Sequence, residues 1–273
     1  MNTTKQVNAI TGVLALLVAK EILSGCRVIA NISLDASRKQ APVSSSLQSH
    51  PDPHYMPLKI SSAMPTIPQL VGSVNGYECS EGLIVVEDSI DPSFHEKEQR
   101  NIPKVIHMTG KTRCMTRTFA ANVDSWRFEG YSLFLHDDNA VDHLLNRWWP
   151  EFPQILDMKN CMMPGAAIAD LWRYVLLWEY GGVYTDIDNA PGPWFWNETG
   201  SVITNSTDAL FEQEKDGFPS QYFFAAAPHH PMMYLAVQNA LLRLMEVQSV
   251  RRQYVPFVTG PGTIKSALVS SHF

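Results

Sequence analysis

Residues 166–189 constrain the fold of this chain more than any other stretch, because a helical pattern in them gives way to a strand pattern. Residues 166–180 contain neither proline nor glycine, and their apolar side chains recur at helical spacing, so we expect a buried helix. The two glycines that follow supply the positive-φ residue that commonly ends a helix. The apolar period then changes to two, which predicts a short strand that ends in Asp186 and Asp188.

Charged side chains interrupt both of these apolar elements. Asp170 and Arg173 are three residues apart, so a helix places them on one face. In the strand, alternation points Tyr184, Asp186 and Asp188 to the same side. Two carboxylates at one strand end repel each other unless a cation lies between them, and hard divalent cations prefer oxygen ligands. We therefore expect Asp186 and Asp188 to bind Mn²⁺ or Mg²⁺.

Each motif has a simpler interpretation when it is taken alone. An Asp-x-Asp triplet arises by chance in many chains, and Asp170 with Arg173 also fits an ordinary surface ion pair. An EF-hand loop is excluded, because Pro191 stands where that loop needs its glycine. The combination is more specific, since charges on so apolar a helix are costly unless they are paired or put to use.

The string A-D-L-W-R-Y-x-L-L-x-E-Y-G-G-V-Y-T-D-I-D resembles the core of the DXD-containing sugar transferases of glycosyltransferase family 32. That family includes initiating α-1,6-mannosyltransferases and mannosyltransferases that act on inositol phosphoceramide. The resemblance implies an α/β fold, a GT-A-like (Rossmann-related) nucleotide-sugar transferase domain with a flexible N-terminal stem. It also implies a metal-dependent transferase that retains anomeric configuration. The string looks closest to the mannosyltransferase branch, which suggests GDP-mannose as donor and a glycan or glycolipid as acceptor.

The resemblance also implies roles for individual residues. Four are expected to be catalytic: Asp170, Arg173, Asp186 and Asp188. Six are expected to bind the nucleotide-sugar donor: His107, Asp170, Arg173, Tyr184, Gly260 and Gly262. His107 ends an I-P-K-x-I-H string like the family's opening strand, near the nucleotide base. The two glycines belong to the turn at residues 259–263, whose backbone N–H groups suit phosphate oxygens. This turn is not a Walker A loop, because Ile264 replaces the required glycine.

Other functions stay open at this point. UDP-galactose and UDP-N-acetylglucosamine are alternative donors within the same family. A catalytically degenerate nucleotide-sugar-binding protein and a nucleotide-sugar hydrolase are alternatives of other classes. Nucleic-acid binding is not expected, since the net charge is −6 and no cluster of lysine and arginine is interleaved with aromatic residues.

The order of the other expected elements indicates an α/β sheet with helices on both faces. Ligands of such sheets bind beyond the carboxyl ends of the strands, where Asp186 and Asp188 fall. The expected strands lie at residues 83–86, 102–108, 131–135 and 222–227, and the expected helices at 119–126, 141–148 and 232–247.

The N-terminal third is expected to lie outside the catalytic domain. An apolar run at residues 10–19 is shorter than the roughly 18 to 20 residues of a spanning helix, so residues 1–35 fit a signal anchor, a signal peptide or an amphipathic helix. The resemblance favours an anchor in the Golgi or another secretory membrane, with a lumenal catalytic domain. Residues 36–70 are rich in Ser, Pro, Gln and His and residues 71–100 are transitional, so we expect a largely irregular stem over residues 36–100. Residues 101–273 then form the catalytic domain, which is shorter at its C-terminus than related transferases.

Four cysteines are present, at positions 26, 79, 114 and 161. They form no C-x-x-C motif, so a structural zinc site is not expected. In a lumenal domain we expect Cys114 to pair with Cys161, whereas in the cytosol all four would be free thiols.

Overall fold

A computed structural model of the chain describes residues 63–95, 100–161, 165–193, 195–197, 200–213, 219–246 and 255–270. The expected N-terminal anchor and residues 36–62 of the expected stem lie outside these residues. Within the described part, no helix is both long enough and apolar enough to cross a membrane.

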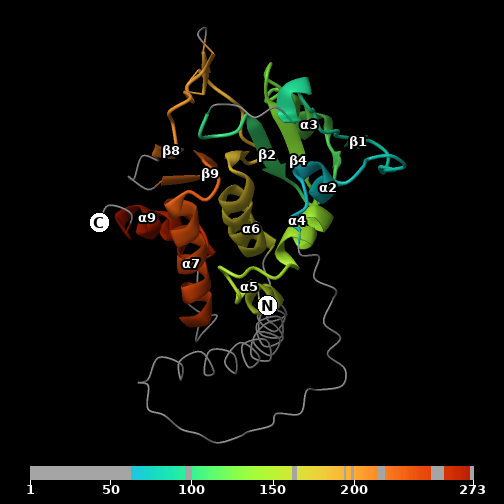
Figure 1. Cartoon of the computed structure of the whole chain (residues 1–273). Coiled ribbons are helices and arrows are strands. Elements are labelled where there is room, and N and C mark those ends of the chain that lie inside the picture. The colour runs from blue at the N-terminus through green and yellow to red at the C-terminus, as the bar shows by residue number, and fades with distance from the viewer. Residues whose placement is uncertain are drawn as a thin grey trace, which may run out of the picture.

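Helices and strands are interspersed along the described chain, and its last elements are helices (Figure 1). The helices are α2 (Ile67–Val71), the 3₁₀ helix η1 (Pro92–His95), α3 (Arg117–Asp124), α4 (Asp138–Leu145), α5 (Ile155–Cys161), α6 (Gly165–Tyr180), α7 (Pro231–Glu246), α8 (Val255–Val258) and α9 (Pro261–Ser270). The strands are β1 (Ile84–Val85), β2 (Val105–Thr109), β3 (Cys114–Met115), β4 (Ser132–His136), β5 (Gly182–Thr185), β6 (Trp196–Asn197), β7 (Gly200–Ser201), β8 (Ala209–Gln213) and β9 (Pro219–Ala226).

A five-stranded mixed sheet with the order β4-β2-β5-β9-β8 forms the centre of the fold. Strands β4, β2 and β5 are parallel, and β9 and β8 pair antiparallel beside them. Because the first three strands run the same way, their last residues, Thr109, His136 and Thr185, lie at one edge of the sheet. The predicted Rossmann-related α/β architecture is confirmed.

Helices cover both faces of this sheet, as the sequence predicts. Strand β5 shows the alternation, since Tyr184 packs into the core cluster of α6 and α7 whereas Val183 packs into the cluster that contains α3. In β9 the neighbours Phe224 and Phe223 divide between the same two clusters. The domain therefore has three layers, with α6 and α7 on one side of the sheet and α3 on the other.

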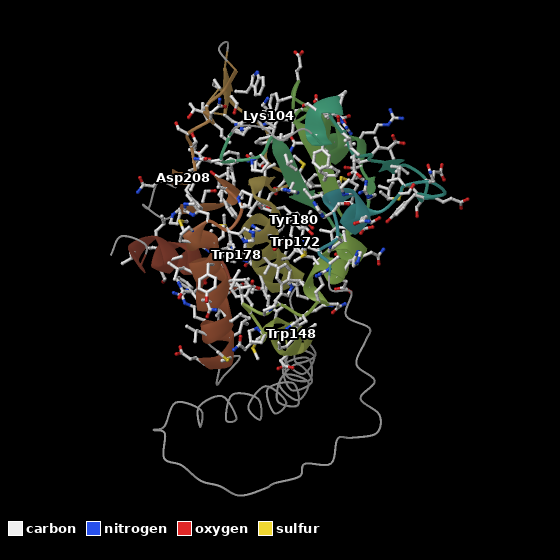
Figure 2. The ribbon with its side chains drawn as sticks, viewed as in Figure 1. Lys104, Trp148, Trp172, Trp178, Tyr180 and Asp208 are labelled. Carbon is white, nitrogen blue, oxygen red and sulfur yellow. A yellow bond between two sulfur atoms is a disulfide. The ribbon has the colours of Figure 1, made fainter. Side chains whose placement is uncertain are left out.

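Helix α6 is the central helix of its layer, and apolar residues surround most of it. Nine of its residues are buried, among them both of its charged residues in the middle turns. Its labelled aromatic residues, Trp172, Trp178 and Tyr180, lie in the middle of the molecule (Figure 2). A helix that is apolar on nearly all sides belongs inside a protein, so α6 fixes the positions of the elements that pack around it.

The backbone conformation after α6 requires glycine at positions 181 and 182. Gly181 has φ 63° and its N–H donates to the carbonyl of Leu177, which ends the helix as predicted. Gly182 has φ 103°, and a Cβ atom there would lie 2.7 Å from the carbonyl oxygen of Val105. Only glycine allows this turn to lie so close to β2.

The folded part begins before residue 101, where we expected its boundary. Leu70 of α2 is buried in the main core cluster, so residues of the expected stem contribute to that core. Asp88 forms an ion pair of 3.0 Å with Arg113, and its Oδ1 also accepts the N–H of Leu135 at 2.8 Å. Ser89 makes a β-bridge to Leu133. The polar composition of this stretch concealed these contacts, since each of them joins residues far apart in the sequence.

The predicted disulfide is wrong, because Cys114 pairs with Cys79. Strands β1 and β3 are antiparallel, with Val85 opposite Cys114, and this pairing brings the segment before β1 alongside β3. The two Cα atoms lie 5.5 Å apart, within the range that a disulfide spans. Cys161 ends α5, whose Met158 packs in the α6 cluster, whereas Met115 of β3 packs in the cluster on the other face of the sheet.

Peptide mapping of the unreduced protein tests this pairing. We expect a peptide that joins Cys79 to Cys114, and we expect Cys114→Ser to lower the free energy of unfolding by about 3 to 4 kcal/mol, since the bond closes a loop over a sequence separation of 35. Ser80→Ala, at an exposed position next to Cys79, is the control and should leave the free energy of unfolding within about 0.5 kcal/mol of the wild type. A peptide that joins Cys114 to Cys161 would contradict the assignment.

Candidate functional site

Helix α6 and strand β5 bring four of the predicted site residues together around one guanidinium group. Arg173 Nη2 lies 3.5 Å from Asp170 Oδ1 and 3.6 Å from Asp186 Oδ1. The guanidinium carbon lies 4.4 Å from the centre of the Tyr184 ring. The Arg173 side chain is only 9% exposed. A buried cation therefore lies between two carboxylates and over an aromatic ring.

Further contacts fix the orientation of Arg173. Its Nη1 donates to the carbonyl oxygen of Gln221 at 2.7 Å, and its Nε donates to the carbonyl oxygen of Ala169 at 3.3 Å. Burial lowers the pKa of Arg173, but Tyr184, Asp186 and Asp170 together outweigh this effect and hold the pKa above its ordinary value. Arg173 is therefore charged at any pH at which the protein is folded, and its charge is matched by the carboxylates beside it.

The turn between α8 and α9 also contacts Asp170. Its Oδ2 accepts a hydrogen bond of 2.9 Å from the hydroxyl group of Thr259. Burial raises the pKa of the Asp170 carboxyl group above its ordinary value, although Arg173 and Thr259 oppose that shift. The side chain is 7% exposed. Asp170 is thus a desolvated carboxylate whose two oxygens face different partners.

Tyr184 and Asp186 point to the same side of β5, as alternation along a strand requires. The hydroxyl group of Tyr184 donates a short hydrogen bond to Asp186 Oδ1. Tyr184 is fully buried, and burial raises its pKa well above the ordinary value, so the hydroxyl group keeps its proton. Asp186 is less buried than Asp170, with 33% of its side chain exposed.

Asp188 does not continue the strand, contrary to the expected alternation. Strand β5 ends at Thr185, Ile187 and Asp188 form a turn, and the N–H of Asn189 donates to the Asp186 carbonyl oxygen at 3.1 Å. The turn leaves Asp188 exposed.

Helix α3 anchors this turn from the other face of the sheet. The amide of Asn122 donates to the carbonyl oxygens of Ile187 and Asn189, at 2.8 Å and 3.1 Å. The indole N–H of Trp126 donates to the carbonyl oxygen of Asn189 at 2.7 Å. The backbone that carries Asp186 and Asp188 is therefore held firmly although the Asp188 side chain is exposed.

The oxygen atoms at the end of β5 fit a hard divalent cation. Asp186 Oδ1 is engaged by Tyr184 and Arg173, but a third of the Asp186 side chain is exposed, and Asp188 beside it is exposed as well. In the part of the chain that the structure describes, no three His, Cys, Asp or Glu side chains are grouped as a metal site. Two carboxylates would thus hold such an ion only together with oxygens from a diphosphate or from water.

The structure buries His107 completely, so its ring does not reach the surface on which Asp186 and Asp188 are exposed. Its Nδ1 lies 3.1 Å from His136 Nε2, and its Nε2 lies 3.1 Å from the carbonyl oxygen of Gly181. The His107 side chain is completely buried. Both ring nitrogens therefore have partners inside the protein, and His107 supports the glycine turn between α6 and β5.

The turn at residues 259–263 differs in part from the expected glycine-rich loop. Gly260 donates its N–H to the carbonyl oxygen of Val255 at 3.0 Å, and a Cβ atom there would lie 2.5 Å from Pro256 Cα. Gly262 is the second residue of α9, so its N–H belongs to the first turn of a helix. Close packing against Pro256 thus explains why position 260 is a glycine. Gly262 instead lies in the first turn of α9.

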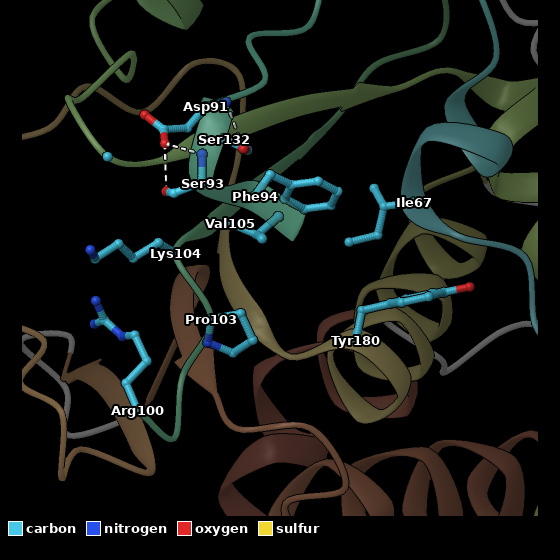
Figure 3. A pocket seen from close by; sticks show the side chains of 11 residues that line it. Ile67, Asp91, Ser93, Phe94, Arg100, Pro103, Lys104, Val105, Ser132 and Tyr180 are labelled. Carbon is cyan, nitrogen blue, oxygen red and sulfur yellow. Dashed lines mark hydrogen bonds between the residues drawn. The ribbon is translucent and has the colours of Figure 1, made fainter. Parts of the chain in front are cut away.

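A cavity of about 250 Å³ lies at the opposite edge of the sheet (Figure 3). Val105 and Ser132, the first residues of β2 and β4, line it together with the ring of Phe94 and the cationic residues Arg100 and Lys104. None of the predicted site residues lines this cavity. It is therefore separate from the carboxylates at the carboxyl end of β5.

Sequence reasoning missed several residues that complete the site. Thr259 lies in the turn that we expected to bind the donor through its glycines. The hydroxyl group next to Gly260 could have marked Thr259 as a further site residue. Gln221 is a polar residue within an otherwise apolar strand, which is also a readable signal. Asn122 gave no signal, since its partners lie 65 and 67 residues further along the chain.

Known proteins with similar sequences share this region. The family described as the glycosyltransferase sugar-binding region containing a DXD motif matches residues 36–201. Inositol phosphoceramide mannosyltransferase 1 of Schizosaccharomyces pombe is 26% identical over 160 residues, which cover 56% of this chain and 47% of that protein. Mannosyl phosphorylinositol ceramide synthase CSH1 of Saccharomyces cerevisiae is 28% identical over 104 residues, 37% of this chain and 27% of that protein.

The chain therefore spans less than half the length of either curated relative. Among solved structures, the PaToxG glycosyltransferase is similar with a TM-score of 0.45 and 16% identity, over 63% of this chain and 70% of that one.

The buried histidine predicts how stability depends on pH. Burial lowers the pKa of His107 from 6.5 to about 4. Below about pH 6.5 the unfolded chain binds a proton that native His107 does not, so stability is complete above that pH and is lost as the pH falls toward 4. This single group accounts for a loss of about 3 kcal/mol across the window.

Urea unfolding between pH 7 and pH 4 measures this effect. We expect His107→Gln to reduce the dependence of the unfolding free energy on pH, because glutamine does not titrate, whereas His136, whose pKa is also lowered by burial, keeps part of the slope. His143→Gln, at an exposed position of α4, is the matched control and should leave the slope unchanged. Curves of equal slope for the wild type and His107→Gln would contradict the prediction.

Proposed function

The chain belongs to the family of glycosyltransferase sugar-binding regions that contain a DXD motif, and from this premise we propose that it transfers mannose from GDP-mannose to an acceptor. The transfer is proposed to need a divalent metal ion and to retain the anomeric configuration of the sugar. One observation carries the proposal: Asp188 is exposed at the end of β5, beside a carboxylate that a buried arginine holds in place.

A glycolipid or glycan is the proposed acceptor, and the curated relatives support the lipid. The names of these relatives refer to inositol phosphoceramide and to mannosyl phosphorylinositol ceramide, and both compounds are lipids. A lipid acceptor would bring the chain to a membrane surface. We therefore propose a location at the Golgi or another secretory membrane, with attachment through the N-terminal residues.

Asp186 and Asp188 are the residues proposed to hold Mn²⁺ or Mg²⁺. Such an ion, when bound, neutralises the charge that develops on a leaving nucleoside diphosphate. The outward position of Asp188 suits it to direct binding, and the contacts of Asp186 Oδ1 with Tyr184 and Arg173 fix its other oxygen. The first turn of α9, which contains Gly262, is proposed to bind phosphate through its N–H groups.

Asp170 and Arg173 are proposed to act on the sugar side of the donor. Oδ2 of Asp170 is engaged by Thr259, so Oδ1, at 3.5 Å from Arg173, is the atom left to accept a sugar hydroxyl group. Arg173 is proposed to balance the negative charge of both neighbouring carboxylates, since its guanidinium group lies 3.5 Å from Asp170 and 3.6 Å from Asp186. His107, Tyr184 and Gly260 are proposed to support the donor site from beneath through their packing.

Substitution of the exposed carboxylate tests the proposal. Asp188→Asn should lower metal-dependent release of GDP from GDP-mannose by at least about a hundredfold, since a metal ligand is lost, while the free energy of unfolding stays within about 0.5 kcal/mol. Release is measured with Mn²⁺, with Mg²⁺ and with a chelator, and with GDP- and UDP-sugars in parallel.

Asp208→Asn is the matched control, because Asp208 is an exposed aspartate next to β8 (Figure 2) and should keep wild-type release. Release from UDP-sugars alone would overturn the mannose assignment and keep the transferase. Free mannose formed without an acceptor would indicate a hydrolase. Wild-type activity in the Asp188→Asn variant would contradict the metal site.

A further inference from the structure

Thr259 contacts the site through its side chain, although it lies on none of the elements that carry the predicted catalytic residues. Its hydroxyl group donates to Asp170 Oδ2 at 2.9 Å, across 89 residues of sequence. The residue is completely buried. A buried hydrogen bond to a carboxylate contributes more than a neutral one, since the acceptor carries charge in a desolvated place.

Thr259 is itself held in place by a small polar network. The hydroxyl group of Tyr174 donates to the Thr259 carbonyl oxygen at 2.7 Å, and the amide of Gln221 donates to the same oxygen at 3.3 Å. That amide also donates to the Tyr174 hydroxyl group. The N–H of Thr259 donates to the carbonyl oxygen of Val255 at 3.0 Å. The position of the hydroxyl group is therefore set by α6, β9 and α8 together.

We propose that Thr259 is a positioning residue, which turns the Asp170 carboxylate so that Oδ1 faces the sugar of the donor. This inference rests on the proposed function. The terminal torsion of an aspartate has a broad energy well, so the carboxylate rotates easily unless a partner holds it. Thr259 is such a partner, because its hydroxyl group binds Oδ2 at 2.9 Å while Arg173 lies nearest Oδ1; the side chain of Gln221 also hydrogen-bonds this carboxylate.

Without the hydroxyl group, Asp170 has a competing partner in Arg173. Its Nη2 lies only 3.5 Å from Oδ1, and a carboxylate free to turn presents both oxygens to a guanidinium group. Such a pair would engage the oxygen that the sugar needs and would draw Arg173 away from Asp186, which lies 3.6 Å away. Thr259 thus holds Oδ2 of Asp170, which leaves Oδ1 as the oxygen nearest Arg173.

Isothermal titration of the full chain in Mn²⁺ tests the proposal with GDP-mannose and with GDP, which lacks the sugar. Thr259→Val keeps the volume and removes the donor, and it should weaken GDP-mannose binding by about tenfold or more while GDP binding is unchanged. Thr259→Ser restores a hydroxyl group and should restore the affinity. Ser132→Ala is the matched control, because Ser132 is also buried but lies at the opposite edge of the sheet, where its hydroxyl group accepts from the N–H of Asp91.

A double-mutant cycle with Asp170→Asn separates positioning from general stability. If Thr259 acts through Asp170, then Thr259→Val should have no further effect on GDP-mannose affinity in the Asp170→Asn background. Additive losses, equal losses for GDP and GDP-mannose, or wild-type affinity in Thr259→Val would each overturn the inference. A wild-type chain that binds no nucleotide sugar would instead overturn the proposed function, and this inference with it.

Discussion

The burial of one guanidinium group between two carboxylates is the interaction on which the rest of this site depends. Arg173 contacts Asp170 on its own helix and Asp186 at the end of β5, and it lies over the ring of Tyr184. Removing one partner of a buried ion pair costs about 3 to 5 kcal/mol, because the remaining charge is left desolvated. The fold therefore tolerates Arg173 in its core only while α6 and β5 keep this arrangement.

The same arrangement divides the carboxylates into two kinds. Asp170 and Asp186 are held by protein groups, the first by Thr259 and Arg173 and the second by Tyr184 and Arg173. Asp188 lies beyond the end of the strand and is exposed on a turn that α3 fixes through its backbone. The buried carboxylate of Asp170 suits the recognition of a sugar, whereas the more exposed carboxylates of Asp186 and Asp188 suit a metal ion with its diphosphate and water. The proposed donor site thus offers separate positions for the sugar and for the diphosphate of a nucleotide sugar.

Local periodicity explains what could be predicted from the sequence. The helix at residues 165–180, the glycine stop and the strand all follow from spacing within a single turn or a few residues, and so does the meeting of Asp170 with Arg173. The missed features join distant segments: the bond between Cys79 and Cys114, and the contact of Thr259 with Asp170. The strand also ended earlier than alternation predicts, because hydrogen bonds from α3 turn its backbone.

A crystal structure of the full chain with Mn²⁺ and GDP-mannose tests the central claim most directly. Anomalous scattering locates the metal ion, and the electron density locates the sugar. The account predicts the metal ion on the Asp188 carboxylate and a sugar hydroxyl group within hydrogen-bond distance of Asp170 Oδ1. A nucleotide bound instead in the cavity beside Arg100 and Lys104, at the opposite edge of the sheet, would contradict it.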